Sequence, residues 1–146
     1  MLEISAPSPW YNNETYLDTL NPRAVEKFVA TTHERYKEAL GESFGKTVPA
    51  IFTDEPQFSR KQTLGFAGEK KDVTLPFTND LCETYKAAYG EDLLDKLPEL
   101  IWELPDGKVS VIRYHYHDHI CERFTEAFAD NCGKWCDEHS LLFTGH

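Results

Sequence analysis

The chain has 146 residues, of which 40% are hydrophobic and 27% are charged, as expected for one globular domain with a modest core. Its 25 acidic residues outnumber its 15 basic residues, and the formal charge of −10 argues against nucleic-acid binding because it repels phosphate. No apolar run is long enough to span a membrane, and the N-terminus lacks the basic and apolar regions of a signal peptide. We therefore predict a single segment, residues 1–146, whose partners include neither nucleic acid nor a membrane.

The first part of the chain predicts a loop followed by a helix. Residues 1–20 are rich in Pro, Asn, Ser and aromatic side chains, which indicates an irregular loop. Asn21 is a favourable N-cap and Pro22 suits the first turn of a helix, so we expect a helix to begin there. Apolar side chains then recur every three or four residues until Gly41 or Gly45, as on a helix that packs along one side.

A buried strand and a long loop should come next. Residues 47–53 form a continuous apolar run, which is typical of a strand buried on both faces. Residues 57–77 contain glycines and lysines without a clean period. They predict a long loop over the end of that strand, and loops of this length often carry function.

Helices dominate the second half of the prediction. Residues 78–80 favour the start of a helix that stops at Gly90, and a short apolar helix interrupted by Pro98 follows. The clearest pattern is helical and runs from residue 109 to about residue 139. Residues 141–144 then suggest a second buried strand without a following helix to cover it. The order of elements indicates a piece of an α/β fold, cut from a larger protein.

The sharpest candidate for chemistry is the pair Asp54 and Glu55, which follows the first predicted strand and precedes Pro56. In parallel α/β folds, catalytic groups sit at the carboxyl ends of strands. A carboxylate sheltered there by a loop and apolar neighbours would suit a general acid. The alternative is that both carboxylates only cap the turn before the proline.

Four further residues are candidates for substrate binding. His146 follows the second predicted strand on the same rim, where an imidazole would bond a sugar hydroxyl or a catalytic carboxylate; as the last residue it would equally be disordered. Arg113, near the start of the longest predicted helix, is a candidate partner for a carboxylate. Trp10 and Phe58 lie in the two loops, where aromatic rings suit either stacking on sugars or hydrophobic anchoring between loops.

Two pairs of residues are of types that bind metal ions, but neither pair forms a complete metal site. His115 and His119 share one helix face, but His117 points away from it. Cys132 and Cys136 are also four residues apart, and zinc would need two more ligands. We therefore expect reduced thiols and no metal or other cofactor, with a metal-binding helical protein as a further hypothesis.

Five strings, in order along the chain, resemble a known family. They are Tyr16-Leu17-Asp18-Thr19-Leu20-Asn21-Pro22, Thr32-His33-Glu34-Arg35-Tyr36, Ile51-Phe52-Thr53-Asp54-Glu55-Pro56, Trp135-Cys136-Asp137-Glu138-His139 and Phe143-Thr144-Gly145-His146. Over residues 16–146 the chain resembles the central part of the catalytic (β/α)8 barrel of large bacterial glycoside hydrolases, of the α-L-rhamnosidase-like and β-galactosidase-like kind. The third and fifth strings are specific in combination and weak singly.

The resemblance implies a partial (β/α)8 barrel fragment, helix-rich, with two short buried strands. It also implies that Glu55 is the general acid/base, that Asp54 orients it and that His146 lines the same cleft. Hydrolysis normally needs two carboxylates, and the later strands that carry the second one are missing, so we expect the isolated chain to be inactive. The exposed barrel edges should favour a homo-oligomer. The alternative function is a non-catalytic carbohydrate-binding or structural helical module.

Overall fold

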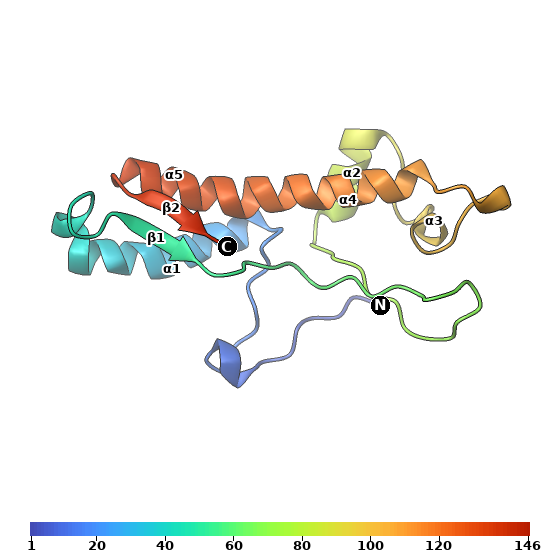
Figure 1. Ribbon diagram of the computed structural model, residues 1–146, viewed down its shortest axis with the longest axis horizontal. Helices are drawn as coiled ribbons and strands as arrows, with labels where there is room; N and C mark the ends of the chain where they lie inside the picture. Colours follow the sequence, from blue (N-terminus) through green and yellow to red (C-terminus); the bar gives the residue numbers. More distant parts are fainter.

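A computed structural model describes residues 1–146 and shows a long helical rod with a small sheet at one end (Figure 1). In chain order, the elements are η1 (Pro9–Tyr11), α1 (Pro22–Leu40), η2 (Gly41–Ser43), β1 (Ala50–Thr53), α2 (Leu81–Tyr89), α3 (Leu97–Ile101), η3 (Pro105–Gly107), α4 (Val111–Phe124), η4 (Thr125–Asp130), α5 (Asn131–Glu138) and β2 (Leu142–Gly145). No helix has both the length and the apolar character that crossing a membrane requires.

Helix α1 begins where the sequence predicts. The side-chain oxygen of Asn21 accepts a hydrogen bond from the backbone N–H of Arg23 at 3.1 Å, and Pro22 occupies the first helical position. This cap satisfies one of the backbone donors that a helix start leaves free. The start predicted from Asn21 and Pro22 is therefore confirmed.

The predicted long helix is also confirmed, as a rod formed by α4, η4 and α5 without a break (Figure 1). The Ser110 hydroxyl caps its start by accepting from the N–H of Ile112 at 3.1 Å. The middle section, η4, has π-helical hydrogen bonding and so is wider than an α-helix. The rod is long enough to contribute to two separate parts of the core.

The core consists of two clusters along this rod. The helical cluster gathers α2, α3 and α4 and contains Leu20, Leu81, Tyr85, Leu93, Leu100, Ile112, Tyr116 and Ile120. The sheet cluster gathers α1, η4 and α5 and contains Val25, Val29, Ala127, Phe128, Cys132, Trp135, Cys136 and Leu141.

A buried arginine connects the segments that precede α1 and α2. The Nη2 atom of Arg123 donates to the carbonyl oxygen of Leu20 at 3.0 Å and to the Asp80 carboxylate at 2.9 Å. Arg123 is only 8% exposed, so its charge needs these partners. The arginine thereby fixes the start of two helices against the rod.

Strands β1 and β2 form a two-stranded parallel sheet beside α1 and α5 (Figure 1). Ala50 lies opposite Leu142, and Thr53 lies opposite Gly145. The chain between the strands contains α2 to α5, so the two strands pair across most of the sequence. Both carboxyl ends consequently lie at the same edge of the sheet.

Only one face of this sheet is covered. Ile51 and Phe143 pack against the sheet cluster. The residues beside them in each strand are exposed: Phe52 in β1 is 56% exposed, and Leu142 in β2 is 70% exposed. Alternate residues of a strand point to opposite faces, so the second face is open to solvent. The prediction of strands buried on both faces was therefore wrong.

The fold class predicted from the resemblance is corrected by the same observations. The structure is a small helix-rich fold with one two-stranded parallel sheet, not a partial (β/α)8 barrel. A continuous apolar run indicates that a strand contacts apolar groups, but it does not specify how many strands join the sheet. Each strand keeps one unpaired edge; the expected homo-oligomer rests on such edges and stays a prediction.

The long loop was predicted correctly. Residues 54–80 contain no helix or strand, and an isolated bridge joins Gln62 to Thr74 across the loop. The Thr19 hydroxyl donates to the Gln57 carbonyl oxygen at 2.6 Å, which attaches the start of the loop to the segment before α1. The start of the loop is therefore held in place close to the end of β1.

Candidate functional site

The carboxyl edge of the sheet brings two of the predicted site residues together. Asp54 follows β1 and His146 follows β2, and His146 Nδ1 lies 3.0 Å from Asp54 Oδ1. The imidazole ring also meets Phe52 edge-on, with 5.2 Å between the ring centroids. Its backbone N–H donates to the carbonyl oxygen of Thr53 at 3.3 Å. The pair is thus positioned by the parallel register of the two strands.

A glycine makes this register possible. A Cβ atom at Gly145 would collide with the carbonyl oxygen and side chain of Thr53 on the neighbouring strand. Gly145 therefore lets the two strand ends approach closely enough for His146 to reach Asp54.

Glu55 occupies an unusual backbone conformation at the same edge. Its φ angle is +44°, in the left-handed region that non-glycine residues rarely adopt, and it precedes Pro56. A proline further restricts the residue before it. Strain of this kind costs on the order of 1 kcal/mol and is concentrated at functional sites. The side chain of Glu55 is exposed, not sheltered beneath the loop as the sequence suggested.

The other predicted substrate contacts do not reach this edge. Trp10 is 87% exposed in η1, which Figure 1 shows well away from the strand ends. Phe58 packs against the helical cluster, where its ring meets Phe124 edge-on at 5.6 Å. Arg113 lies at the start of α4, at the opposite end of the rod (Figure 1). Of the four residues, only His146 is at the sheet edge.

The histidines of α4 are engaged by their neighbours. Tyr89 stacks on His115 with 4.4 Å between ring centroids, and its hydroxyl donates to Asp118 at 3.1 Å. His119 Nε2 lies 2.9 Å from the hydroxyl oxygen of Thr84. No group of three or more His, Cys, Asp or Glu side chains is arranged to hold a metal ion. These histidines therefore form an aromatic and polar contact between α2 and α4.

The cysteines are all free thiols. Cys132 and Cys136 are buried in the sheet cluster. Burial raises the pKa of the Cys132 thiol to about 11, and it also raises the pKa of Cys136. Both side chains are consequently protonated at neutral pH and behave as small apolar groups.

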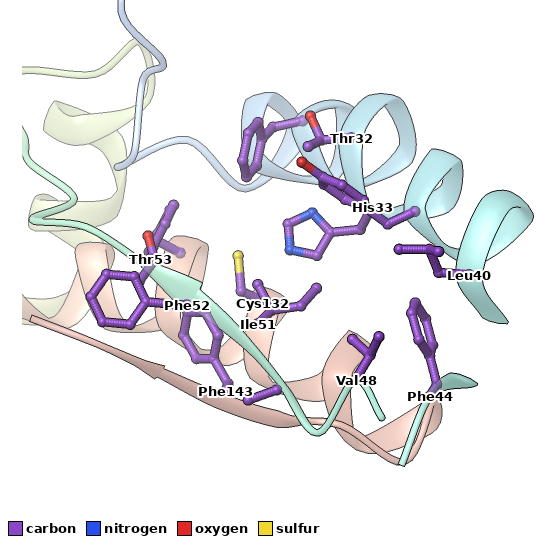
Figure 2. Close-up of a pocket in the computed structure, with 14 residues that line it drawn as sticks. Thr32, His33, Leu40, Phe44, Val48, Ile51, Phe52, Thr53, Cys132 and Phe143 are labelled. Atoms are coloured by element: carbon purple, nitrogen blue, oxygen red, sulfur yellow. The ribbon is translucent and has the colours of Figure 1, made fainter. Parts of the chain in front are cut away.

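A pocket of about 390 Å³ between α1 and the sheet was not anticipated from the sequence (Figure 2). Its lining is mostly apolar and comes from α1, β1, the turn between them, β2 and the rod. It consists of Phe28, Thr32, His33, Tyr36, Leu40, Phe44, Val48, Ala50, Ile51, Phe52, Thr53, Phe128, Cys132 and Phe143. The apolar stripe of α1 was expected to be packed, yet Tyr36 and Leu40 are 55% and 44% exposed at this opening.

His33 is the main polar group in this pocket, and its ring points into it (Figure 2). The residue is 4% exposed, and neither ring nitrogen has a hydrogen-bond partner. The imidazole meets Phe28 and Trp135 edge-on, at centroid distances of 5.4 and 5.0 Å. Burial lowers the pKa of His33, and the Glu34 carboxylate opposes this only in part. The ring is therefore neutral at physiological pH.

Chemically, the sheet edge offers a solvent-accessible carboxylate at Glu55 beside a hydrogen-bonded Asp54–His146 pair. A carboxyl group transfers protons, and an imidazole whose Nδ1 is bonded to a carboxylate keeps Nε2 for a ligand. No family model, no curated protein and no solved structure was found to match the chain.

Proposed function

We propose that the carboxyl edge of β1 and β2 is the acid/base part of a glycoside hydrolase site, with Glu55 as the general acid/base. The observation that carries this proposal is the strained φ of +44° at Glu55, next to the 3.0 Å contact between Asp54 and His146. Strained residues at the end of a parallel strand mark functional sites in α/β folds. The five strings that resemble glycoside hydrolases support the same chemistry.

Each residue of the edge has a distinct role in this proposal. The carboxyl group of Glu55 protonates the leaving glycosidic oxygen and then, as a carboxylate, accepts a proton from water. Asp54 accepts a hydrogen bond from Nδ1–H of His146 and so holds the ring. The Nε2 atom of His146 is then an acceptor for a sugar hydroxyl. Asp54 is a positioning residue, while Glu55 and His146 contact the substrate.

Hydrolysis also needs a second carboxylate, about 5–5.5 Å or 6.5–9.5 Å from the first. Asp54 already has His146 as its hydrogen-bond partner. We therefore propose that the second carboxylate comes from outside this edge. The 146-residue chain alone should bind sugar without turning it over.

The test has a binding arm and a turnover arm. Nitrophenyl glycosides should shift the NMR signals of Gly145 and His146 in a saturable way, and His146→Ala should weaken that binding about tenfold through loss of a hydrogen bond. Glu55→Gln should spare binding. In a longer protein that contains this chain, Glu55→Gln should reduce hydrolysis by at least about 100-fold, as the loss of a general acid does. Glu42→Gln, an exposed acidic residue in η2, is the matched control.

The outcomes separate the two candidate functions. Turnover that survives Glu55→Gln would refute the catalytic role of Glu55. Binding at the edge without turnover by any form of the protein would favour the carbohydrate-binding module, which the open, exposed edge also suits. Absence of both binding and turnover across the panel would refute the sugar assignment.

A further inference from the structure

A second cleft, of about 420 Å³, lies between the long loop, the end of α3 and the start of α4. Its lining combines charged, aromatic and aliphatic side chains. It consists of Lys61, Thr63, Leu64, Gly65, Phe66, Ala67, Leu100, Ile101, Trp102, Glu103 and Arg113. The residues come from three separate segments, so the cleft exists only because the loop folds against the helices.

Two hydrogen bonds hold the walls of the cleft together. The indole Nε1–H of Trp102 donates to the carbonyl oxygen of Ala67 at 3.2 Å, which joins the loop to the end of α3. The Nη2 atom of Arg113 donates to the carbonyl oxygen of Trp102 at 2.8 Å, which joins α4 to the same residue. The guanidinium is therefore oriented by the backbone, while Nε is buried and has no partner.

The cleft concentrates positive charge in an acidic protein. Lys61 and Arg113 both line it, and neither forms an ion pair with a carboxylate. Lys61 Nζ lies 2.8 Å from Nε2 of His117, and an ammonium group is only a donor, so this nitrogen accepts and the ring is neutral. Glu103 is the only acidic side chain in the lining. The local charge thus opposes the overall charge of −10.

The charges of Lys61 and Arg113 also act on His117. Burial lowers the pKa of His117, and the nearby charges of Lys61 and Arg113 lower it further. A bound anion would offset both charges and would supply an acceptor for the arginine. An anion is therefore the kind of ligand that the charges of this cleft favour.

We propose that this cleft binds the carboxylate of a sugar acid, a hexuronate, through Arg113 and Lys61. A planar guanidinium pairs well with a planar carboxylate. Trp102 and Phe66, which are 44% and 68% exposed, offer aromatic faces for the sugar ring. Glu103 can accept hydrogen bonds from hydroxyl groups, and it disfavours a more highly charged phosphate.

The choice of a sugar rests on the proposed function, whereas the choice of an anion rests on the charges alone. The loop that carries Lys61 continues from Glu55 and Pro56, and the cleft lies toward the other end of the rod from the sheet edge (Figure 1). In this proposal the cleft holds a unit of the substrate that is remote from the bond to be cleaved. Binding energy from such a unit improves the positioning of the reacting part.

The experiment titrates the 146-residue chain with galacturonate, its neutral methyl ester and inorganic phosphate, and follows Trp102 and His117 by NMR. Galacturonate should bind saturably and raise the pKa of His117. The ester should bind at least about tenfold more weakly, since it lacks the charge-assisted hydrogen bonds. Arg113→Met and Lys61→Met should each weaken galacturonate binding by about tenfold or more for the same reason. Lys70→Met, at an exposed lysine of the same loop outside the lining, should bind as the wild type does.

Each alternative outcome overturns a defined part of the proposal. Equal affinity for galacturonate and its ester, or unchanged affinity in the Arg113→Met chain, would refute anion recognition. Phosphate binding as tight as galacturonate binding would refute the sugar acid as the ligand class. Glu55→Gln should leave galacturonate binding unchanged, so loss of hydrolysis and loss of cleft binding can be told apart. Retained amide dispersion in each variant shows that the chain is folded.

Discussion

The two ends of the helical rod differ in how completely they enclose their apolar side chains. At the helical cluster, three helices surround Leu81 and Tyr85, which are both fully buried. At the sheet cluster, the inner residues are also buried, but α1 and β1 leave a pocket between them, and Phe52 remains exposed. The candidate acid/base residues lie at this second, less enclosed end. The helical end therefore contributes closely packed core, and the sheet end leaves the pocket and the candidate acid/base residues accessible.

Buried polar groups without a hydrogen-bond partner occur at both ends of the rod. Near the helical cluster, the Thr78 hydroxyl donates to Asp18 at 2.7 Å and the Tyr116 hydroxyl donates to the carbonyl oxygen of Pro76, although the Tyr85 hydroxyl has no partner. At the sheet end, both nitrogens of the buried His33 are unpaired. An unpaired buried polar group destabilises the folded state. Unpaired polar groups therefore do not distinguish the two ends, which differ in how their apolar side chains are enclosed.

The largest expected difference between the two ends is in leucine truncation. Leu81→Ala removes a fully buried side chain and should lower the free energy of unfolding by about 3 kcal/mol, because it creates a cavity among three helices. Leu40→Ala removes the same atoms from the pocket rim, where the side chain is 44% exposed, and should cost less than about 1 kcal/mol.

Urea unfolding followed by circular dichroism measures both values. Both substitutions lie at a helix end, where helix propensity contributes little to the comparison. Similar losses for the two substitutions would contradict the comparison, since they would show that Leu40 is as enclosed as Leu81.

The sequence predicted local features better than the packing around the sheet. The start of α1 follows from Asn21 and Pro22, and the rod follows from apolar spacing over residues 109–139, because both signals arise within a few residues. The burial of β1 depends on what packs on each face of the sheet, which residues 47–53 do not encode. The barrel expected from the resemblance failed for this reason.

The candidate site was predictable in part. Placing Asp54 and His146 at strand ends required only the assumption that the strands are parallel neighbours, and they lie 3.0 Å apart. The strain at Glu55 and the cleft around Arg113 had no local signal, because they depend on a turn geometry and on how the long loop folds. Phe58 packs against the helical cluster, which is the hydrophobic anchoring that its sequence context offered as the alternative to sugar stacking.

A smaller difference should appear in the pH dependence of stability. The pKa of His33 is lowered from 6.5 in the folded chain, so the unfolded chain takes up a proton first as the pH falls. The stabilisation is thus present above the unfolded pKa and is lost as the pH falls below it. His117 and His119 are shifted in the same direction and contribute similarly.

His33→Phe should remove one of these contributions. Below about pH 6.5, the slope of unfolding free energy against pH should decrease by up to about 1.4 kcal/mol per pH unit. Urea unfolding at several pH values between about 5 and 7.5 measures the slope. An unchanged slope in the His33→Phe chain would mean that this imidazole is accessible to protons in the folded state.

The smallest expected effect concerns Glu55 and has the opposite sign. Glycine adopts a φ of +44° without steric cost, but it also makes the unfolded chain more flexible. Because the relief of strain exceeds this entropy term, Glu55→Gly should raise the free energy of unfolding by about 0.5 kcal/mol. Glu42→Gly, at an exposed glutamate with no positive φ, should instead lower it. Thermal unfolding of both variants measures the difference. A stabilising Glu55→Gly would indicate that this glutamate is kept at a cost to stability, as residues retained for chemistry are. A destabilising Glu55→Gly would show that the carboxylate contributes contacts to the fold, and the backbone strain would then no longer support a catalytic role.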